Sequence, residues 1–294
     1  MSRSDKGGTA QLRSGQVRWQ TVAYQCLTFL TDYGLEDAFV GVCHGISAQI
    51  APSSPIIDIT HLIPPGDIRR GAAVLAQAVP YFGRAVHVAV VDPGVGTARR
   101  GIAVAAADGA AFVGPDNGLL SWAVTACGGA VHAVSLTNRD LWLDAVMPTF
   151  HGRDIFIPVA AHLAAGVPLT AAGEPVDTSS LVTLPPLPSR VEGGRAEGEV
   201  VTADRFGNVQ LSVTGADAAR IGAVPGVRVA IRWGQEGVLI VPFGRTFGDV
   251  GPGELLAYTD SSGQVSLAVN GGSAAGRLPA ASSGTKVTIT VTPE

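Results

Sequence analysis

One strand pattern that stops at an acidic residue constrains the fold most. Val86 to Val91 is an almost unbroken run of small and β-branched residues, typical of a strand buried on both faces of a parallel sheet. Asp92 ends the run, the turn Pro93-Gly94 follows, and Arg99 and Arg100 come shortly after. A carboxylate at the carboxyl end of such a strand, with a guanidinium in reach, is a common way to build a ligand site in α/β proteins. An ordinary turn with a surface ion pair is the alternative for this stretch alone.

Apolar runs and helical patterns alternate through the first 165 residues. Further strands are predicted at about 24–30, 55–59, 101–107, 111–113 and 130–135, and helices from about residues 37, 67, 117 and 154. This alternation is typical of a mostly parallel sheet covered by helices on both sides. Asp67 is the predicted N-cap of the second helix. The apolar face predicted for the first helix consists of Phe39, Val42, Ile46 and Ile50.

The composition changes after residue 183. Residues 184–195 contain Leu184-Pro185-Pro186-Leu187-Pro188 and Gly193-Gly194, and they are predicted to be a linker. Short β-rich runs follow at 198–203, 208–213, 227–232, 237–241, 254–259, 264–269 and 286–292, which indicates a small antiparallel barrel or sandwich. We therefore predict an α/β domain over 23–183 and a smaller β domain over 196–294. Residues 1–22 are predicted to be a disordered tail.

Composition excludes several classes of function. The 294 residues carry a formal net charge of −4 and contain no basic block, so nucleic acid is not an expected partner. No apolar run reaches membrane-spanning length, and residues 1–20 lack the apolar core of a secretion signal. Cys26, Cys43 and Cys127 are far apart and form no CxxC pair, which argues against a zinc site or a disulfide framework. We expect Cys26 and Cys43 to be core thiols and the compartment to be the reducing cytoplasm.

Polar side chains follow several predicted strands at the point where each strand ends. Asp32 ends the first strand, Asp92 ends the strand described above, and Asp116 follows the strand at 111–113. His151 stands just before a predicted helix. Because carboxyl ends of parallel strands meet at one edge of a sheet, we expect these groups to converge there. Each has a plainer alternative as a turn or helix-cap residue.

The sequence gives little support for a resident metal or a nucleotide phosphate. His44, His61, His87, His132 and His162 are isolated from one another along the chain, and no pair has the spacing of a zinc motif. The glycines of Gly94-Val95-Gly96-Thr97 lack the lysine of a phosphate-binding loop. No metal ligands are therefore predicted.

Six segments together resemble the S-adenosylmethionine (SAM) hydroxide adenosyltransferase family, which is related to fluorinase and chlorinase. These segments, in order, are Phe29-Leu30-Thr31-Asp32-Tyr33-Gly34, Asp58-Ile59-Thr60-His61 with Ile63-Pro64-Pro65, Val90-Val91-Asp92-Pro93-Gly94-Val95-Gly96-Thr97, Gly114-Pro115-Asp116-Asn117-Gly118-Leu119-Leu120, Thr149-Phe150-His151-Gly152-Arg153-Asp154 and Asp204-Arg205-Phe206-Gly207-Asn208. They cover the chain from about residue 27 to residue 270.

The resemblance implies a fold, a reaction and a set of residues. It implies an α/β domain followed by a β-barrel domain, in a homotrimer whose ligand lies between one subunit's first domain and its neighbour's second. The implied reaction splits SAM with water into adenosine and L-methionine, without a cofactor. The catalytic set falls on Asp92, Arg99 and His151, and the ribose-binding acid on Asp32. Further substrate contacts fall on Pro93, Asn117, Thr149, Phe150 and Gly152, and in the second domain on Asp204, Phe206, Asn208, Phe247, Ser261, Asn270 and Gly271. The tryptophan that walls the fluorinase pocket falls at Gly66.

The reaction explains why these residue types are needed. A sulfonium makes methionine a neutral leaving group, so the site needs neither a general acid nor a metal. Water must attack C5′ in line with the departing sulfur, and alignment alone supplies up to roughly 7–11 kcal/mol in well-oriented systems. Asp92 can orient the water and take its proton while Arg99 favours the charged carboxylate. His151 can hold the water or relay the proton, and both assignments stay open.

Three other functions compete with SAM hydrolysis. The first is a SAM-dependent halogenase of the chlorinase type, but the resemblance places tyrosines at the positions of Asp92 and His151 in halogenases, and an acid at this point would repel a halide. The second is a sensor that binds SAM or adenosine without turnover, for which a catalytic set is unnecessary. The third is a metal-dependent phosphohydrolase that would use Asp32, Asp92 and Asp116.

Overall fold

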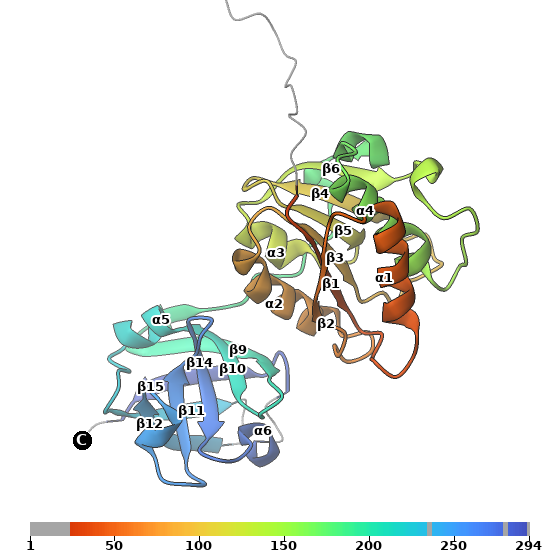
Figure 1. The fold of residues 1–294 in the computed structure, drawn as a ribbon. Helices are drawn as coiled ribbons and strands as arrows, with labels where there is room; N and C mark the ends of the chain where they lie inside the picture. The colour runs from red at the N-terminus through yellow and green to blue at the C-terminus, as the bar shows by residue number, and fades with distance from the viewer. Residues whose placement is uncertain (1–23, 234–236, 279–281, 293–294) are drawn as a thin grey trace, which may run out of the picture.

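The computed structural model describes residues 24–233, 237–278 and 282–292, and the tail predicted at 1–22 lies outside these ranges. The described chain forms an α/β domain followed by a β-barrel domain (Figure 1). This is the fold class that the sequence predicts.

A seven-stranded sheet forms the centre of the first domain. Its order is β2 (Ile56–Thr60), β1 (Leu27–Thr31), β3 (Val86–Val90), β5 (Ala111–Pro115), β4 (Gly101–Ala106), β6 (Ala130–Leu136) and β7 (Gly173–Val176). The pairs from β2 to β5 are parallel, whereas the pairs from β5 to β7 are antiparallel, so the sheet is mixed. Every residue of β1 and β3 is buried, as expected for central strands covered on both faces.

Helices cover the two faces of this sheet (Figure 1). One core contains Leu27 and Phe29 of β1 and residues of α1 (Phe39–Ile50) and α4 (Ile157–Ala164). The other contains Leu30 and residues of α2 (Ile68–Ala78) and α3 (Ser121–Ala126). The alternation of Phe29 and Leu30 between the two cores follows from the two-residue period of a strand.

The structure corrects two details of the predicted helices. In α1 the buried residues are Val40, Cys43 and Ser47. Of the predicted face, Ile46 and Ile50 pack partly buried against the core, whereas Phe39 and Val42 are 44% and 41% exposed. Both sets have helical spacing, and Val40 and Cys43 belong to the same core as the buried residues of α4, against which α1 packs. The helix predicted near residue 117 begins at Ser121. By contrast, Asp67 caps α2 as predicted, since its Oδ1 accepts a hydrogen bond from the backbone N–H of Arg70 at 2.9 Å.

The second domain is a closed barrel of seven strands. These are β9 (Arg195–Ala203), β10 (Val209–Thr214), β11 (Arg228–Trp233), β12 (Gly237–Gly244), β13 (Leu255–Thr259), β14 (Gln264–Val269) and β15 (Lys286–Val291). Closure follows because β10 pairs with both β14 and β9. All pairs are antiparallel except β12 with β13. Short helices α5 (Gly215–Arg220) and α6 (Ala274–Arg277) lie between strands.

Part of the predicted linker belongs to this domain. Arg190–Glu192 forms β8, which pairs with β9. Gly193 and Gly194 make the two-residue turn between them, with φ of +56° and +74°. Positive φ at both positions is characteristic of a type I′ hairpin turn, which explains why two glycines stand there.

The first turns of α2 contact the barrel. Arg69 pairs with Glu199 of β9, and Arg70 donates to the hydroxyl of Thr202 on the same strand. Further along α2, the side-chain amide of Gln77 donates to Gln210 of β10 at 2.7 Å. Helix α2 therefore links the two domains directly.

Two simpler observations complete the fold. The three cysteines are free and buried, in agreement with the prediction of core thiols for Cys26 and Cys43. Among the helices described here, every one is too short or too polar to cross a bilayer.

Candidate active site

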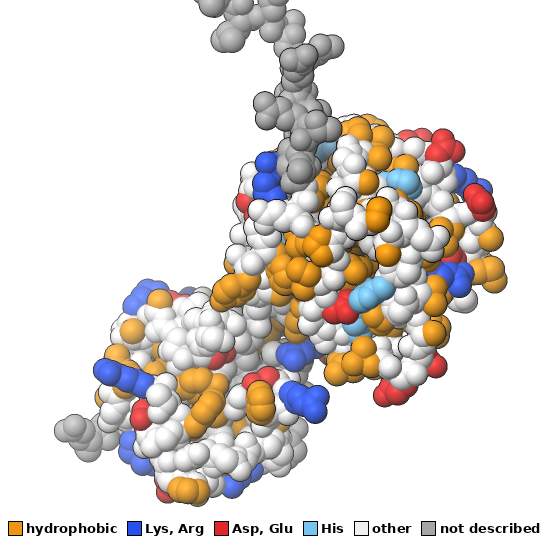
Figure 2. Space-filling model, in the orientation of Figure 1, with side chains coloured by type: hydrophobic (Ala, Val, Ile, Leu, Met, Phe, Trp, Pro, Cys, Tyr) orange, Lys and Arg blue, Asp and Glu red, His pale blue; other side chains and the backbone are white. Residues whose placement is uncertain are grey.

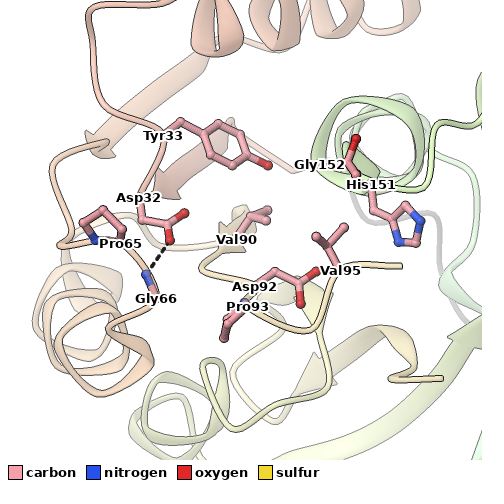
Figure 3. A pocket seen from close by; sticks show the side chains of 11 residues that line it. Asp32, Tyr33, Pro65, Gly66, Val90, Asp92, Pro93, Val95, His151 and Gly152 are labelled. Carbon is pink, nitrogen blue, oxygen red and sulfur yellow. Dashed lines mark hydrogen bonds between the residues drawn. The ribbon is translucent and has the colours of Figure 1, made fainter. Parts of the chain in front are cut away.

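A cavity of about 350 Å³ opens at the carboxyl ends of β1 and β3 (Figure 3). It is lined by Asp32, Tyr33, Pro65, Gly66, Val90, Asp92, Pro93, Val95, Thr149, His151 and Gly152. The edge of the sheet that the sequence predicts as a ligand site therefore holds a cavity, and Asp32, Asp92 and His151 all face it. A cavity of this volume falls within the range of small-molecule sites.

Asp32 is held by the loop that precedes α2. The backbone N–H of Gly66 donates to Oδ2 of Asp32 at 2.8 Å, so one carboxylate oxygen is oriented and the other is left for a ligand (Figure 3). Gly66 has a φ of +74°, a conformation that favours glycine. A Cβ at Gly66 would meet only Pro93, at 4.0 Å. The position onto which the resemblance places the fluorinase tryptophan is therefore open space on this side of the cavity.

Asp92 and His151 are joined through Arg99. Nε of Arg99 lies 3.0 Å from Oδ1 and 2.9 Å from Oδ2 of Asp92, and Nη2 also donates to Oδ2. The same Nη2 lies 2.9 Å from Nδ1 of His151. The guanidinium is stacked over the ring of Phe156, 5.1 Å from its centroid, which fixes its plane. Phe156 is a supporting residue that the sequence did not single out.

The contact with Arg99 determines the tautomer of His151. A guanidinium can only donate hydrogen bonds, so Nδ1 of His151 must be the acceptor and the ring proton sits on Nε2. The electrostatics also favour the neutral ring. Burial has the largest effect and the charge of Arg99 the next largest, and both lower the pKa of His151. Asp92 and Asp154 act in the opposite direction, but the net shift is downward. His151 is therefore a neutral imidazole that presents an N–H donor.

The second arginine of the motif lies outside this set. Nε of Arg100 donates to Oδ2 of Asp116 at 2.9 Å, and Nη2 donates to the carbonyl of Ser180 at 2.7 Å. The other oxygen of Asp116 accepts from the backbone N–H of Val182 at 2.9 Å. Asp116 and Arg100 thus fasten the segment around residue 180 to the sheet, and the three acids required by the phosphohydrolase alternative do not converge.

The remaining predicted contacts of the first domain divide into two groups. Pro93, Thr149 and Gly152 line the cavity. Asn117 instead donates from its side-chain amide to the carbonyl of Val91 at 2.9 Å, so it shapes the end of β3. Phe150 packs edge-on against Tyr33, 5.6 Å between ring centroids, behind the cavity wall.

Tyr33 is a cavity residue that sequence reasoning missed. Its hydroxyl occupies the space beside Gly152, where an added Cβ would lie 1.9 Å from that oxygen. Burial raises the pKa of Tyr33 far above its ordinary value, so the hydroxyl stays protonated. The signal was its place in the first motif, next to Asp32.

The predicted contacts of the second domain lie on the barrel, and none of them lines this cavity. Oδ1 of Asp204 accepts from the backbone N–H groups of Phe206 and Asn208, both at 2.9 Å, which shapes the β9–β10 turn. That turn holds Phe206 77% exposed. Phe247, 45% exposed, packs on Tyr258 with 5.3 Å between centroids. Burial, Asp260 and Asp204 raise the pKa of Tyr258 to about 12.

Three further positions were predicted on the barrel. Asn270 donates from its side-chain amide to the carbonyl of Val250 at 2.8 Å. Gly271, with a φ of +73°, follows it at the end of β14. Ser261 lies elsewhere: it lines a separate cavity of about 280 Å³ together with Gln77 and Trp122 of the first domain. The structure therefore does not bring Ser261 to the main cavity.

Two histidines that are isolated along the sequence meet in the fold. His44 of α1 and His61, just after β2, both approach the carboxylate of Asp58, which corrects the expectation that they lie apart. This cluster is separate from the residues that line the main cavity.

Comparison with known proteins identifies close relatives. Residues 27–173 match the model of the SAM hydroxide adenosyltransferase N-terminal domain, and residues 198–287 match that of the C-terminal domain. A protein of Salinispora tropica named (R)-S-adenosyl-L-methionine hydrolase is 56% identical over 259 residues, covering 86% of this chain and 93% of the relative. A protein of the same name from Thermus thermophilus is 43% identical, covering 84% and 92%.

More distant sequences and a solved structure complete the comparison. A fluorinase of Actinoplanes sp. is 29% identical, covering 83% of this chain and 90% of the relative. The crystal structure of an uncharacterized conserved protein from Thermotoga maritima is 36% identical and superimposes with a TM-score of 0.84, covering 90% of this chain and 99% of that chain. Hydrolases are thus more similar to this sequence than the fluorinase is.

Proposed function

The chain belongs to the SAM hydroxide adenosyltransferase family, and on that premise we propose that it hydrolyses SAM to adenosine and L-methionine. The observation that carries the proposal is the Asp92–Arg99–His151 set, which borders the same cavity as Asp32. Relatives at 56% and 43% identity are named for the (R) form of SAM, and we propose the same form as the substrate here.

Asp32 is the proposed anchor for the ribose. One of its oxygens accepts from Gly66, and the other is available for a hydroxyl of the sugar. A carboxylate can accept from two neighbouring hydroxyl groups of one ribose, which fixes both position and orientation. Anchoring the ring holds C5′ at a set distance from Asp92, and such alignment is the main source of acceleration for a reaction with a good leaving group.

Asp92 is the proposed acceptor for the proton of the attacking water. Each carboxylate oxygen has two acceptor positions, so Asp92 can bind Arg99 and still accept from water. His151 presents Nε2–H and lacks a free lone pair while Arg99 occupies Nδ1. Its proposed role is to donate to the water oxygen from a second side and so orient a lone pair toward C5′. The tautomer thus favours Asp92 over His151 as the base.

The same geometry disfavours halide as the nucleophile. A halide needs donors around it and no adjacent negative charge, whereas Asp92 faces the cavity as an acceptor. Water uses both an acceptor and a donor, and the Asp92 and His151 pair offers one of each.

We propose that the complete site forms between subunits of a homotrimer. In one chain the cavity is lined by residues of the first domain alone, while Phe206 and Phe247 of the barrel stay exposed. Leu35 and Leu62, on loops that neighbour the cavity, are 63% and 57% exposed. Aromatic residues such as Phe206 and Phe247 are enriched at protein–protein interfaces. A neighbour's barrel would supply the aromatic contacts for adenine.

We further propose a reducing compartment such as the cytoplasm, because three free cysteines are compatible with it. No cofactor is proposed for the reaction, since the sulfonium needs no Lewis acid to leave.

One incubation tests the proposed reaction and its alternatives. The purified chain is incubated with each epimer of SAM in ¹⁸O-labelled water containing chloride, and the products are separated by chromatography and mass spectrometry. Hydrolysis at C5′ places the label in the 5′ hydroxyl of adenosine. Formation of 5′-chloro-5′-deoxyadenosine would establish a halogenase, and SAM recovered unchanged in complex with the protein would establish a sensor. Retention of activity after treatment with a chelator is expected.

A further inference from the structure

Two histidines and a carboxylate from three segments converge on the exposed side of β2. His44 comes from the middle of α1, Asp58 from β2 and His61 from the loop that follows β2. Nε2 of His44 lies 2.8 Å from Oδ1 of Asp58, and Nε2 of His61 lies 3.0 Å from the same oxygen. All three donor atoms lie within 4.8 Å of one another. In the space-filling view, histidine and acidic side chains adjoin on this face of the first domain (Figure 2).

His61 has a nitrogen that the protein leaves without a hydrogen bond. Its side chain is 2% exposed, and its buried Nε2 has no partner that meets hydrogen-bond geometry, even though Asp58 is close. Its Nδ1 lies 2.8 Å from the hydroxyl of Thr31. When Nδ1–H donates to that hydroxyl, Nε2 presents a bare lone pair toward the negative Oδ1 of Asp58. An unpaired buried polar atom is costly, and a cation between Nε2 and Oδ1 would satisfy both.

We propose that His44, Asp58 and His61 bind one divalent first-row transition-metal ion, with Zn²⁺ as the representative ion. Two imidazoles and one carboxylate form a donor set that such ions favour. Ligands of a tetrahedral zinc ion lie roughly 3.3 Å apart, for bonds of about 2.0–2.1 Å. The two histidine–carboxylate separations, 2.8 and 3.0 Å, therefore require only a small outward shift. The side chains of His44 and Asp58 are 34% and 37% exposed, which leaves room for water as the fourth ligand.

The fold provides the supporting contact that a metal-bound histidine usually has. The bond between Nδ1 of His61 and the hydroxyl of Thr31 fixes the ring and directs Nε2 toward Asp58. The ring of Phe29 packs edge-on against His61, with 4.9 Å between centroids, and further restricts its rotation. Two of the three donors are thus held on regular elements, and the third is locked by packing.

The ion would connect α1 to β2 beside the loops of the main cavity. The carbonyl of His61 accepts from the backbone N–H of Gly34 at 2.8 Å, and Thr31 directly precedes Asp32. The donors themselves are not among the residues that line the cavity, so the ion takes no part in the hydrolysis. Its expected effect is to stabilise the fold of the first domain, and this inference stands independently of the proposed reaction.

The test is metal binding by the full chain. Protein stripped with a chelator is titrated with Zn²⁺ by calorimetry and with Co²⁺ by visible absorption, and its thermal unfolding is measured with and without Zn²⁺. The proposal requires one ion per chain, an imidazole-type cobalt spectrum and a higher unfolding temperature with Zn²⁺. His44→Ala and Asp58→Asn, both at partly exposed positions, should each weaken binding at least tenfold and abolish the thermal shift.

His162→Ala is the matched control, because it removes a partly buried histidine on α4 and should leave metal binding unchanged. The circular dichroism of each variant reports its folding, and hydrolysis of SAM by His44→Ala should equal that of the wild type. Absence of Zn²⁺ binding by the folded wild type would overturn the proposal. Equal affinity in His44→Ala, Asp58→Asn and the wild type would overturn it as well.

Discussion

Nη2 of Arg99 lies 2.9 Å from Nδ1 of His151, and this contact makes the imidazole a neutral donor. Arg99 also donates hydrogen bonds to both carboxylate oxygens of Asp92, so one guanidinium contacts both groups that we propose to face the attacking water. The proposed division of work follows directly: Asp92 accepts the proton, and His151 orients the water. Four predictions test the assignments built on this arrangement and the electrostatics of the fold.

Asp92→Asn should abolish hydrolysis and leave SAM binding nearly intact. The amide keeps the size of the carboxylate but cannot take up a proton, so turnover should fall by roughly 10²–10⁴-fold, the usual contribution of a general base. Adenosine release measures turnover, and calorimetry measures binding. Asp140→Asn, at an exposed acid, is the control. Wild-type turnover in Asp92→Asn would remove Asp92 from the mechanism.

Arg99→Gln should impair catalysis, whereas Arg100→Gln should impair stability. Arg99 contacts Asp92 and His151, so its loss should reduce kcat at least a hundredfold, comparable to losing one transition-state contact. Arg100 pairs with Asp116 and the carbonyl of Ser180, so its loss should lower the unfolding temperature and change kcat less than threefold. Steady-state kinetics and thermal unfolding of both variants separate the two roles. A larger kcat defect in Arg100→Gln would reverse the assignment.

Hydrolysis should lose activity on the acid side only below the ordinary histidine range. Burial, and after it the charge of Arg99, lower the pKa of His151 below 6.5, the ordinary value for histidine. The ring therefore stays neutral at a pH at which an ordinary histidine is already partly protonated. Protonation of His151 at lower pH places a second N–H against Arg99 and breaks the contact. NMR titration should show a His151 pKa below that of a free histidine, and Arg99→Gln should move it upward. His162, whose pKa burial lowers, is the internal control and should not move.

Stability should decrease as the pH falls from about 6.5 to about 4, because of His87. This fully buried ring bonds to Thr28 at 2.8 Å and stacks on Phe112, and burial lowers its pKa to about 4. The unfolded chain therefore binds a proton at a higher pH than the native chain does. Stabilisation by the neutral ring is complete above the unfolded pKa and is lost as the pH falls through this window, by about 3 kcal/mol in total.

Urea unfolding across this pH range measures the effect, and His87→Gln provides the comparison. Glutamine can bond to Thr28 and does not titrate, so its stability should depend less on pH than that of the wild type. Identical pH slopes for the two proteins would show that His87 does not contribute. His151 and His162 titrate in the same direction and remain in both proteins.

The sequence predicted secondary structure and the position of the cavity correctly where a residue pattern is compatible with only one type of element. The run 86–91 can be stable only as a central strand, and the acid after it lies at the ligand edge of the sheet. The seven β-rich runs after residue 196 became the seven strands of the barrel, because each is bounded by turn residues. Two consecutive glycines such as Gly193-Gly194 occur both in hairpin turns and in flexible linkers. Only the pairing of β8 with β9 distinguishes the two cases.

Other features depend on contacts between distant segments, which a single sequence does not encode locally. Arg99 and Arg100 are equivalent by position, and only the packing of Phe156 and Asp116 separates their roles. The buried face of α1 is fixed by what α4 presents to it. His44 and His61 are 17 positions apart on different elements and meet because both flank Asp58 across α1 and β2. Their meeting is a result of tertiary structure alone.

One turn of backbone contacts both the proposed ribose anchor and the neighbouring domain. Gly66 grips Asp32, Asp67 caps α2, and Arg69 then reaches Glu199 on the barrel, all within four residues. A change at Glu199 would therefore act through Arg69 on Asp32, the carboxylate that we propose to hold the sugar. Substitutions on this face of the barrel should in this way alter the proposed ribose contact in the first domain of the same chain.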